Sequence, residues 1–273
     1  MEATDKVFAG PIPQIYEQLL VPLIFRPYAE DLAARVMALR PSRILELAAG
    51  TGALTRAMAA RRDGASIVAT DLNQPMLDLA AAQLPGDAGV VWQQADALDL
   101  PFAGESFDVA ACQFGVMFFP DKPKSHSEVR RVLRPGGRYL FNVWDGVASN
   151  DFTVVLLEAL AEAFPADPPR FIERTPHGYH DAGTIELDLM AGGFARPMIE
   201  RVEKRARAAS AIDVATGFCQ GTPIRGEIEA RGSPGLMAAT EAVAKALERR
   251  FGSGPIEGGL AAFVVSAERD QRQ

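Results

Sequence analysis

Histidine, cysteine and tryptophan are scarce in this chain of 273 residues, which has three, two and two of them. The two cysteines, Cys112 and Cys219, are too few for a disulfide framework or a cysteine-rich zinc site. Cys112 lies in an apolar stretch, so core packing is its expected role. We expect no bound metal, because the candidate ligands His177, His180 and Asp181 have no further cluster to complete a site.

Excess basic charge and long apolar runs are also lacking. The chain has 28 Lys and Arg against 35 Asp and Glu, a formal net charge of −7. This balance argues against general binding to a nucleic-acid backbone, which requires a basic face. No apolar run approaches the ~20 residues of a membrane span, and the beginning, Met1-Glu2-Ala3-Thr4-Asp5, does not resemble a signal peptide. We expect a cytoplasmic protein without a nucleic-acid partner.

Between residues 43 and 144, short apolar stretches alternate with amphipathic helical ones. This alternation predicts an α/β fold whose parallel strands are joined by right-handed crossovers. Further strands are expected at 198–206 and 260–267, which gives a sheet of about seven strands flanked by helices. The expected parts are an N-terminal helical segment or lid (1–42), a core (43–147 and 183–273), and helical cap insertions on the substrate side (148–182 and about 210–235).

Prolines and glycines set two expected boundaries. Pro11, Pro13 and Pro22 predict that the chain begins as loop with only a short helix, around 14–20. Pro135-Gly136-Gly137 is expected to separate a helix from a strand that begins at residue 138.

The turn Ala48-Ala49-Gly50-Thr51-Gly52 follows a predicted buried strand and precedes a helix. Gly50 and Gly52 let a ligand approach the backbone closely. Open α/β sheets bind ligands at the carboxyl ends of strands, so Glu46 is expected on the rim of a nucleotide-like site. A dinucleotide fingerprint has a third glycine where this chain has Thr55, and Glu46 would repel a pyrophosphate. The turn alone leaves two cofactors open, a dinucleotide or the cationic S-adenosylmethionine.

Acidic residues also follow the next two predicted strands. Asp71 comes 19 residues after Gly52, where a carboxylate can accept both ribose hydroxyls; the alternative is a helix N-cap. Asp96 is placed to accept from an adenine amino group, or is an unrelated loop residue. The fourth strand continues into Gln113–Pro120, which should face a sulfonium and a methyl acceptor. Phe118 offers an aromatic face there, or packs in the core.

In combination these residues resemble the class I S-adenosylmethionine-dependent methyltransferases, specifically the methyltransferase type 11 and ubiquinone/menaquinone-biosynthesis-like group. The resemblance is carried by Glu46–Gly52, Asp71-Leu72-Asn73, Asp96-Ala97, Pro101-Phe102 with Ser106-Phe107-Asp108, and Arg131–Gly137. The chain departs from the family at Ala48, where the family has its first turn glycine. The resemblance implies a Rossmann-like fold, S-adenosylmethionine as cofactor and S-adenosylhomocysteine as product.

The resemblance also implies which residues contact the cofactor. Glu46 and the turn Ala48–Gly52 hold the methionine end, and Asp71 holds the ribose. The other implied contacts are Leu72, Met76, Asp96 and Ala97 around the adenine, Gln113 and Gly115 on the methionine side with Phe114 and Phe118 beside them, and Tyr16 from a closing N-terminal segment.

The expected reaction is in-line displacement of a methyl group onto a small-molecule acceptor, mainly by proximity and orientation. A general base helps only if the acceptor must lose a proton. His177 is the candidate base, and the alternative is that His177 and His180 are surface-loop residues; His126 is a further candidate. Aromatic residues in the insertions suggest an acceptor that is partly apolar or aromatic. A protein or nucleic-acid methyltransferase and a non-catalytic cofactor-binding module remain alternatives, and the sequence leaves the acceptor and the oligomeric state open.

Overall fold

A computed structural model describes residues 8, 10–84, 86 and 88–271. The first seven residues lie outside the described residues. Two predictions fall on them: that the chain does not begin with a signal peptide, and that the lid begins there. The chain forms two compact units. Unit 1 combines Met1–Pro27, Asp145–Gly178 and Glu203–Ala261, and unit 2 combines Tyr28–Trp144, Tyr179–Val202 and Ala262–Gln273. The lid and substrate-side roles of the predicted segments stay predictions.

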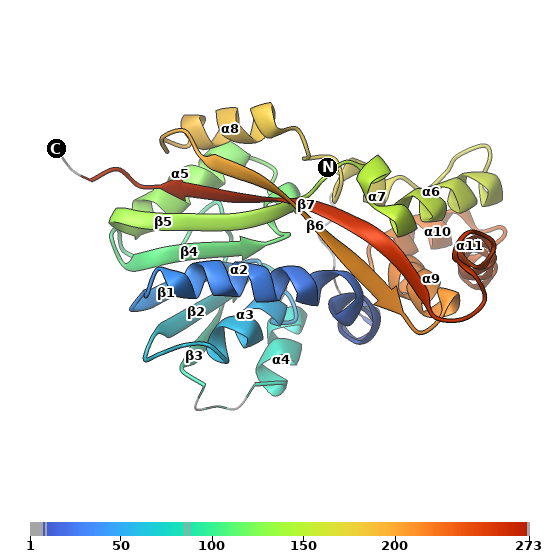
Figure 1. Ribbon diagram of the computed structural model, residues 1–273, viewed down its shortest axis with the longest axis horizontal. Helices are drawn as coiled ribbons and strands as arrows, with labels where there is room; N and C mark the ends of the chain where they lie inside the picture. The colour runs from blue at the N-terminus through green and yellow to red at the C-terminus, as the bar shows by residue number, and fades with distance from the viewer. Residues whose placement is uncertain (1–7, 9, 85, 87, 272–273) are drawn as a thin grey trace. The chain divides into compact units, whose positions relative to one another are not determined.

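A seven-stranded sheet has the order β3-β2-β1-β4-β5-β7-β6, which can be followed in Figure 1. Its first five strands pair in parallel, and β7 runs antiparallel to β5. This confirms the predicted mostly parallel α/β sheet. The strands are β1 (Arg43–Leu47), β2 (Ser66–Asp71), β3 (Val90–Gln94), β4 (Phe107–Gln113), β5 (Leu133–Trp144), β6 (Met198–Ala208) and β7 (Ile256–Glu268).

The helices associated with unit 2 cover the sheet through apolar faces. Leu32 of α2 and Leu54 of α3 pack with Ile44 of β1 in one buried cluster. His126 of α5 contacts the rings of Tyr139 and Phe141 on β5. The helices are α2 (Arg26–Ala38), α3 (Ala53–Ala59), α4 (Gln74–Ala82), the 3₁₀ turn η3 (Val116–Phe118), α5 (Lys122–Val132) and α8 (Ala182–Ala191).

Unit 1 is mainly helical. Helix α9 packs against α11 and η2, and α6 packs against α11. In the described ranges, no helix has the length and apolarity to cross a membrane. The helices of unit 1 are α1 (Ile12–Ile15), η2 (Tyr16–Phe25), η4 (Val147–Ser149), α6 (Asp151–Ala163), α7 (Phe171–Arg174), α9 (Ala211–Gln220), α10 (Ile224–Arg231) and α11 (Leu236–Phe251).

The short helix predicted around 14–20 is present but longer than expected, because it begins with α1 at Ile12 and continues through Pro22 in η2, which is a π-helix. In a π-helix the backbone bonds span five residues, as between the Arg26 N–H and the Val21 carbonyl. Proline has no N–H to donate, and in an α-helix its ring clashes with the carbonyl four residues earlier. The wider turns remove that clash, so the chain continues as helix into α2.

The predicted start of β5 at residue 138 is also wrong. The strand begins at Leu133, directly after α5. Leu133 pairs with Phe107 and Arg138 with Val109, so the register shifts between the two pairs. The Pro135-Gly136-Gly137 segment is therefore a bulge inside the strand and not a break before it.

Candidate functional site

The carboxyl ends of four adjacent parallel strands meet at one edge of the unit 2 sheet. Strands β3, β2, β1 and β4 are neighbours in that order and run in the same direction. Parallel strands place their carboxyl ends together, and ligands of open α/β sheets bind there. Most of the predicted cofactor contacts lie at or after these ends; the exception is Tyr16, which belongs to unit 1, as does the candidate base His177.

The turn after β1 has the left-handed backbone that its sequence predicts. The φ angles are 50° at Ala48, 57° at Gly50 and 83° at Gly52. A Cβ on Gly52 would lie 3.1 Å from atoms of both Ala80 and Trp92, so glycine also allows the close packing of this turn. Ala48 adopts a conformation that costs a residue with a Cβ about 1–2 kcal/mol. Alanine at position 48, where the family has a glycine, therefore adds strain, and its backbone still adopts the left-handed conformation.

Glu46 is buried and does not lie on the rim, which corrects the sequence interpretation. Its side chain is 1% exposed, and Oε2 accepts a hydrogen bond from the Thr55 hydroxyl at 2.6 Å. Burial raises the pKa of Glu46 to about 8; the Thr55 hydrogen bond opposes this rise, and the nearby charge of Asp71 adds to it. Thr55 orients the acid, a role that the sequence reasoning missed because it treated Thr55 only as an absent glycine.

Asp71 connects the end of β2 to the turn after β1. One carboxylate oxygen accepts from the Gly50 N–H at 2.8 Å, and the other accepts from the Asn73 N–H at 2.8 Å. Burial raises the pKa of Asp71, although these backbone amides oppose the rise. The alternative of a helix N-cap is wrong, because Asn73 occupies the cap of α4.

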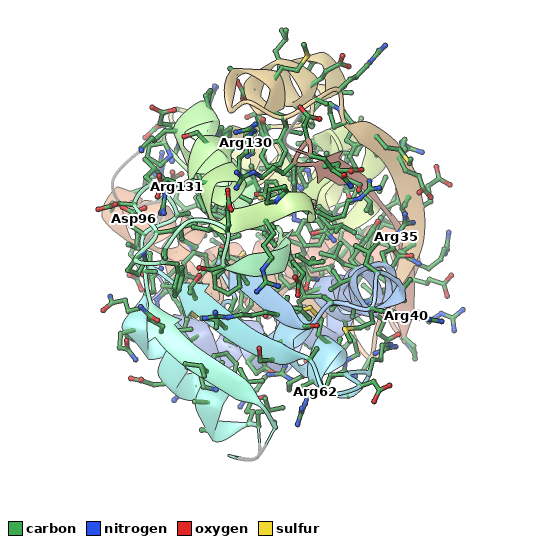
Figure 2. All side chains as sticks on the ribbon, turned by 90° about the vertical axis from the view of Figure 1, so that its left-hand side faces the viewer. Arg35, Arg40, Arg62, Asp96, Arg130 and Arg131 are labelled. Carbon is green, nitrogen blue, oxygen red and sulfur yellow. The ribbon has the colours of Figure 1, made fainter. Side chains whose placement is uncertain are left out.

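Of the four residues predicted around adenine, all but Met76 are more exposed than Glu46 and Asp71. Leu72 is 45% exposed, and its carbonyl accepts from the Gln94 side chain at 2.8 Å. Met76 is buried. Asp96 is exposed, as Figure 2 shows, and accepts from the Leu98 N–H at 2.9 Å; Ala97 beside it is half-buried. The adenine contacts stay predictions.

The turn after β4 is fixed by an aromatic cluster and an asparagine. Phe114 has a φ of 49°, and its ring stacks on Trp144 with centroids 3.8 Å apart. Tyr28 meets the Phe114 ring edge-on, with centroids 5.4 Å apart. The Phe114 N–H donates to the backbone carbonyl and the side-chain oxygen of Asn142, at 3.1 and 3.0 Å. Asn142 was missed in the sequence, although a polar residue within an apolar strand is a recognisable signal.

Gly115 allows the two loops to meet. A Cβ on Gly115 would lie 2.5 Å from the Ala48 Cβ and 2.7 Å from the Cys112 Sγ. The turns after β1 and β4 can therefore contact each other only because residue 115 has no side chain. Cys112 is buried beside it, as expected for a core residue. Gln113 and Phe118 flank this turn and are half-buried.

The chemistry of the turn residues fits a cationic nucleoside cofactor. Glu46 and Asp71 supply two buried carboxylates, which can accept from an ammonium and from hydroxyl groups. The Thr51 hydroxyl is buried and has no hydrogen-bond partner among the residues that the structure describes. A buried polar group without a partner costs free energy, so a ligand that engages Thr51 would be stabilised.

The histidines differ in burial: His177 lies inside the protein and His180 on its surface. His177 is 5% exposed, with Nδ1 2.7 Å from the Asp145 carbonyl oxygen and Nε2 3.4 Å from the Thr153 hydroxyl. The surface-loop alternative is therefore wrong for His177 and holds for His180, which is exposed. Burial lowers the pKa of His126 to about 3, so this side chain stays neutral. The roles of His177 as a base and of Tyr16 as a cofactor contact stay predictions.

Residues 45–141 match the methyltransferase-domain family. A ubiquinone/menaquinone biosynthesis C-methyltransferase, UbiE, from Burkholderia vietnamiensis is 33% identical over 163 residues, which are 56% of this chain and 67% of that protein. A demethylmenaquinone methyltransferase from Deinococcus radiodurans is 32% identical over 157 residues, 56% of this chain and 65% of that protein. The chain spans 38%, 65% and 52% of the length of three such curated relatives.

Solved structures share the fold. The YcgJ protein from Bacillus subtilis is 20% identical with a TM-score of 0.57, over 90% of this chain and 100% of that one. Phosphoethanolamine N-methyltransferase 2 from Haemonchus contortus, in complex with S-adenosyl-L-methionine, is 19% identical with a TM-score of 0.59, over 95% of this chain and 57% of that one. The sequence match, the sheet order and the acidic strand ends agree: this chain belongs to the class I S-adenosylmethionine-dependent methyltransferases, in the methyltransferase-domain family with the ubiquinone and menaquinone biosynthesis enzymes.

Proposed function

We propose that this protein transfers a methyl group from S-adenosylmethionine to a small-molecule acceptor. The observation that carries the proposal is the pair of buried carboxylates, Glu46 and Asp71, on either side of the glycine turn. Burying two acids close together is unfavourable unless cationic or hydrogen-bond-donating groups complement them. A cofactor with an ammonium, a sulfonium and two ribose hydroxyls supplies those groups.

The side chains have separate tasks in this proposal. Glu46, oriented by Thr55, accepts from the ammonium of the methionine end, and Asp71 accepts from the ribose hydroxyls. The Phe114–Gly115 turn borders the methionine end, where its backbone is held by Asn142. When bound, S-adenosylmethionine supplies an electrophilic methyl group. The protein then has to orient the acceptor and exclude water, and orientation can supply about 7–11 kcal/mol.

For the acceptor we propose a molecule with an apolar, aromatic ring of the quinone type. Support comes from the names of relatives at 32–33% identity, which act in menaquinone and ubiquinone biosynthesis. The Tyr28–Phe114–Trp144 cluster adds apolar, aromatic character beside the β4 turn. The competing functions are methyl transfer to a protein and a non-catalytic role in binding the cofactor. Our proposal of a small-molecule methyltransferase includes a cytoplasmic location.

Calorimetric titration with S-adenosylmethionine and S-adenosylhomocysteine tests the cofactor, on protein freed of carried-over ligand. We expect wild type to bind both, and Glu46→Gln to bind S-adenosylmethionine at least about tenfold more weakly through loss of a charged hydrogen bond. Glu257→Gln is the matched control, because Glu257 is an exposed carboxylate of unit 1 paired with Arg205 and Arg207. Absence of binding by folded, ligand-free wild type contradicts the proposal.

Methyl transfer to reduced naphthoquinone and benzoquinone rings, followed with isotopically labelled S-adenosylmethionine, tests the acceptor. We expect labelled ring product with wild type and a large loss with Gly52→Val, which fills the close-packed turn. Labelling of protein substrates with no labelled ring product supports the competing acceptor instead. Cofactor binding without any transfer supports the non-catalytic alternative.

A further inference from the structure

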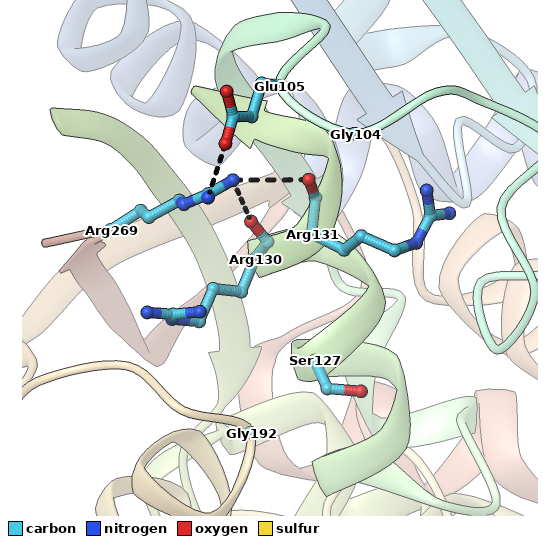
Figure 3. Close-up of a pocket in the computed structure, with 7 residues that line it drawn as sticks. All are labelled: Gly104, Glu105, Ser127, Arg130, Arg131, Gly192 and Arg269. Atoms are coloured by element: carbon cyan, nitrogen blue, oxygen red, sulfur yellow. Dashed lines mark hydrogen bonds and ion pairs between the residues drawn. The ribbon is translucent and has the colours of Figure 1, made fainter. Parts of the chain in front are cut away.

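A groove of about 510 Å³ lies in unit 2, away from the carboxyl ends of the parallel strands. Figure 3 shows the residues that line it: Gly104, Glu105, Ser127, Arg130, Arg131, Gly192 and Arg269. Glu105 lies just before β4, and Arg131 in the last turn of α5. The groove is therefore at the amino end of β4, whereas the glycine turn follows the carboxyl end of its parallel neighbour β1. The two sites are separate.

Arginines dominate the lining, and two of the three are committed to protein partners. Arg131 donates to the carbonyls of Phe102 and Leu100, at 2.7 and 2.9 Å, and pairs with Glu128 at 2.8 Å. Arg269 pairs with Glu105 at 3.0 Å. These two guanidinium groups are held by carboxylates of the protein and are not available as primary contacts for a ligand.

Arg130 differs from the arginines around it. The carboxylates of Asp108 and Glu268 pair with Arg134 and Arg138, near the same end of the sheet. Within the described residues the side chain of Arg130 has no ion-pair or hydrogen-bond partner, and its Nε is buried. A half-buried guanidinium without an acceptor is unfavourable, and a native structure normally supplies one. Figure 2 labels Arg130 and Arg131 on α5, and in Figure 3 their side chains point in opposite directions, with no dashed line from the Arg130 side chain to the other residues drawn.

The end of α5 also accommodates negative charge, although a helix C-terminus normally repels it. Arg269 donates to the carbonyls of Arg130 and Arg131, at 3.1 and 3.3 Å, and to the Leu133 carbonyl. Terminal carbonyls that already accept from a cation carry little free negative character. Of the three guanidinium groups of the lining residues, those of Arg269 and Arg131 are paired with Glu105 and Glu128, so the charge of Arg130 is the one left without a carboxylate among the described residues.

We propose that this groove is a second ligand site, which binds the oxyanion group (phosphate or carboxylate) of a small molecule through Arg130. The planar guanidinium matches an oxyanion in bidentate geometry. The volume is within the range of small-molecule sites. The site needs no cofactor, so its failure would leave the proposed methyl transfer untouched.

The test is a titration of the full chain with inorganic phosphate, glycerol phosphate and acetate, each at constant ionic strength, followed by amide chemical shifts. We expect saturable binding with a dissociation constant on the order of 1 mM for at least one probe. The moving amides should be those of Ser127 and Gly192 in the groove, while Gly50 and Gly52 stay unchanged. A stronger response to glycerol phosphate than to acetate identifies a phosphate-bearing ligand, and the reverse identifies a carboxylate.

Substitutions localise the binding. Arg130→Gln should weaken binding by at least about tenfold, and Arg130→Lys, which keeps the charge without the planar fork, should weaken it less. Arg138→Gln is the matched control, because Arg138 is already paired with Glu268 at 2.8 Å, and it should bind as wild type does. Wild type without saturable binding, or equal weakening by Arg130→Gln and Arg138→Gln, overturns the proposal.

Discussion

At the scale of single residues, the buried acid Glu46 has the largest electrostatic consequence. Its pKa is raised from 4.5 to about 8, so the protein without cofactor favours the neutral acid. A cationic ligand that contacts Glu46 reverses this preference, because it stabilises the carboxylate. Binding of the cofactor should therefore release a proton near neutral pH, which calorimetry in buffers of different ionisation enthalpy detects.

The same pKa predicts how stability depends on pH. Neutral Glu46 contributes its full amount to the free energy of unfolding below pH 4.5, which is near its pKa in the unfolded chain. That contribution is lost as the pH rises through about 8, its pKa in the folded protein. Relative to Glu46→Gln, cofactor-free wild type should lose stability across this window, on the order of several kcal/mol. Urea unfolding of both proteins at several pH values measures the difference. If the free energies of unfolding of the two proteins change with pH in the same way, Glu46 keeps an ordinary pKa in the folded protein.

His177 gives a second prediction at this scale. Its ring is buried and contacts the Asp145 carbonyl and the Thr153 hydroxyl, so packing is its more direct role. We expect His177→Ala to lower the melting temperature while cofactor affinity and turnover per folded molecule stay near wild type. A large fall in turnover at unchanged melting temperature would instead favour the general base. His180→Ala, at an exposed position, is the control.

At the scale of elements, the contact between the β1 and β4 turns can be tested directly. Gly115→Ala places a Cβ 2.5 Å from the Ala48 Cβ and should destabilise the protein by about 1–3 kcal/mol. Ala48→Gly alone should change stability little, because relief of the left-handed strain offsets the greater freedom of the unfolded chain.

The double variant separates this contact from general damage. Ala48→Gly should recover part of the loss caused by Gly115→Ala, and the remainder reflects the Cys112 Sγ at 2.7 Å. Denaturant unfolding of the four proteins gives the coupling energy. Strictly additive effects would show that the two turns do not constrain each other.

Strands were the most predictable elements from sequence, and their side-chain partners the least. The buried strand predicted before the Ala48–Gly52 turn is present as β1, because an apolar run that ends at small residues and glycine is a clear signal. The continuous helix through Pro22 was not predictable, since its π turns depend on packing in unit 1, where Leu20 is buried. The partnership of Glu46 with Thr55 joins a strand to a helix, and its geometry is set only by the fold.

At the scale of the whole molecule, ligand preference is the most general test of the family. S-adenosylmethionine at about 100 times its dissociation constant should stabilise the protein by about 2.7 kcal/mol and raise the melting temperature by several degrees. NAD should produce no shift, because Thr55 stands where a dinucleotide-binding fingerprint has its third glycine, and its side chain is committed to Glu46. A clear shift with NAD at the same concentration would contradict the cofactor assignment.

The charged side chains of β6 bear on whether the sheet can pair with another molecule. It is an outer strand of the sheet, eleven residues long, and most of its side chains are charged or exposed. Arg35 pairs with Glu200, and Arg205 and Arg207 pair with Glu257. An unpaired strand edge is a template for another chain, and dense charge along it opposes such addition. We therefore expect the charged side chains of β6 to oppose the addition of a strand from another molecule along this edge.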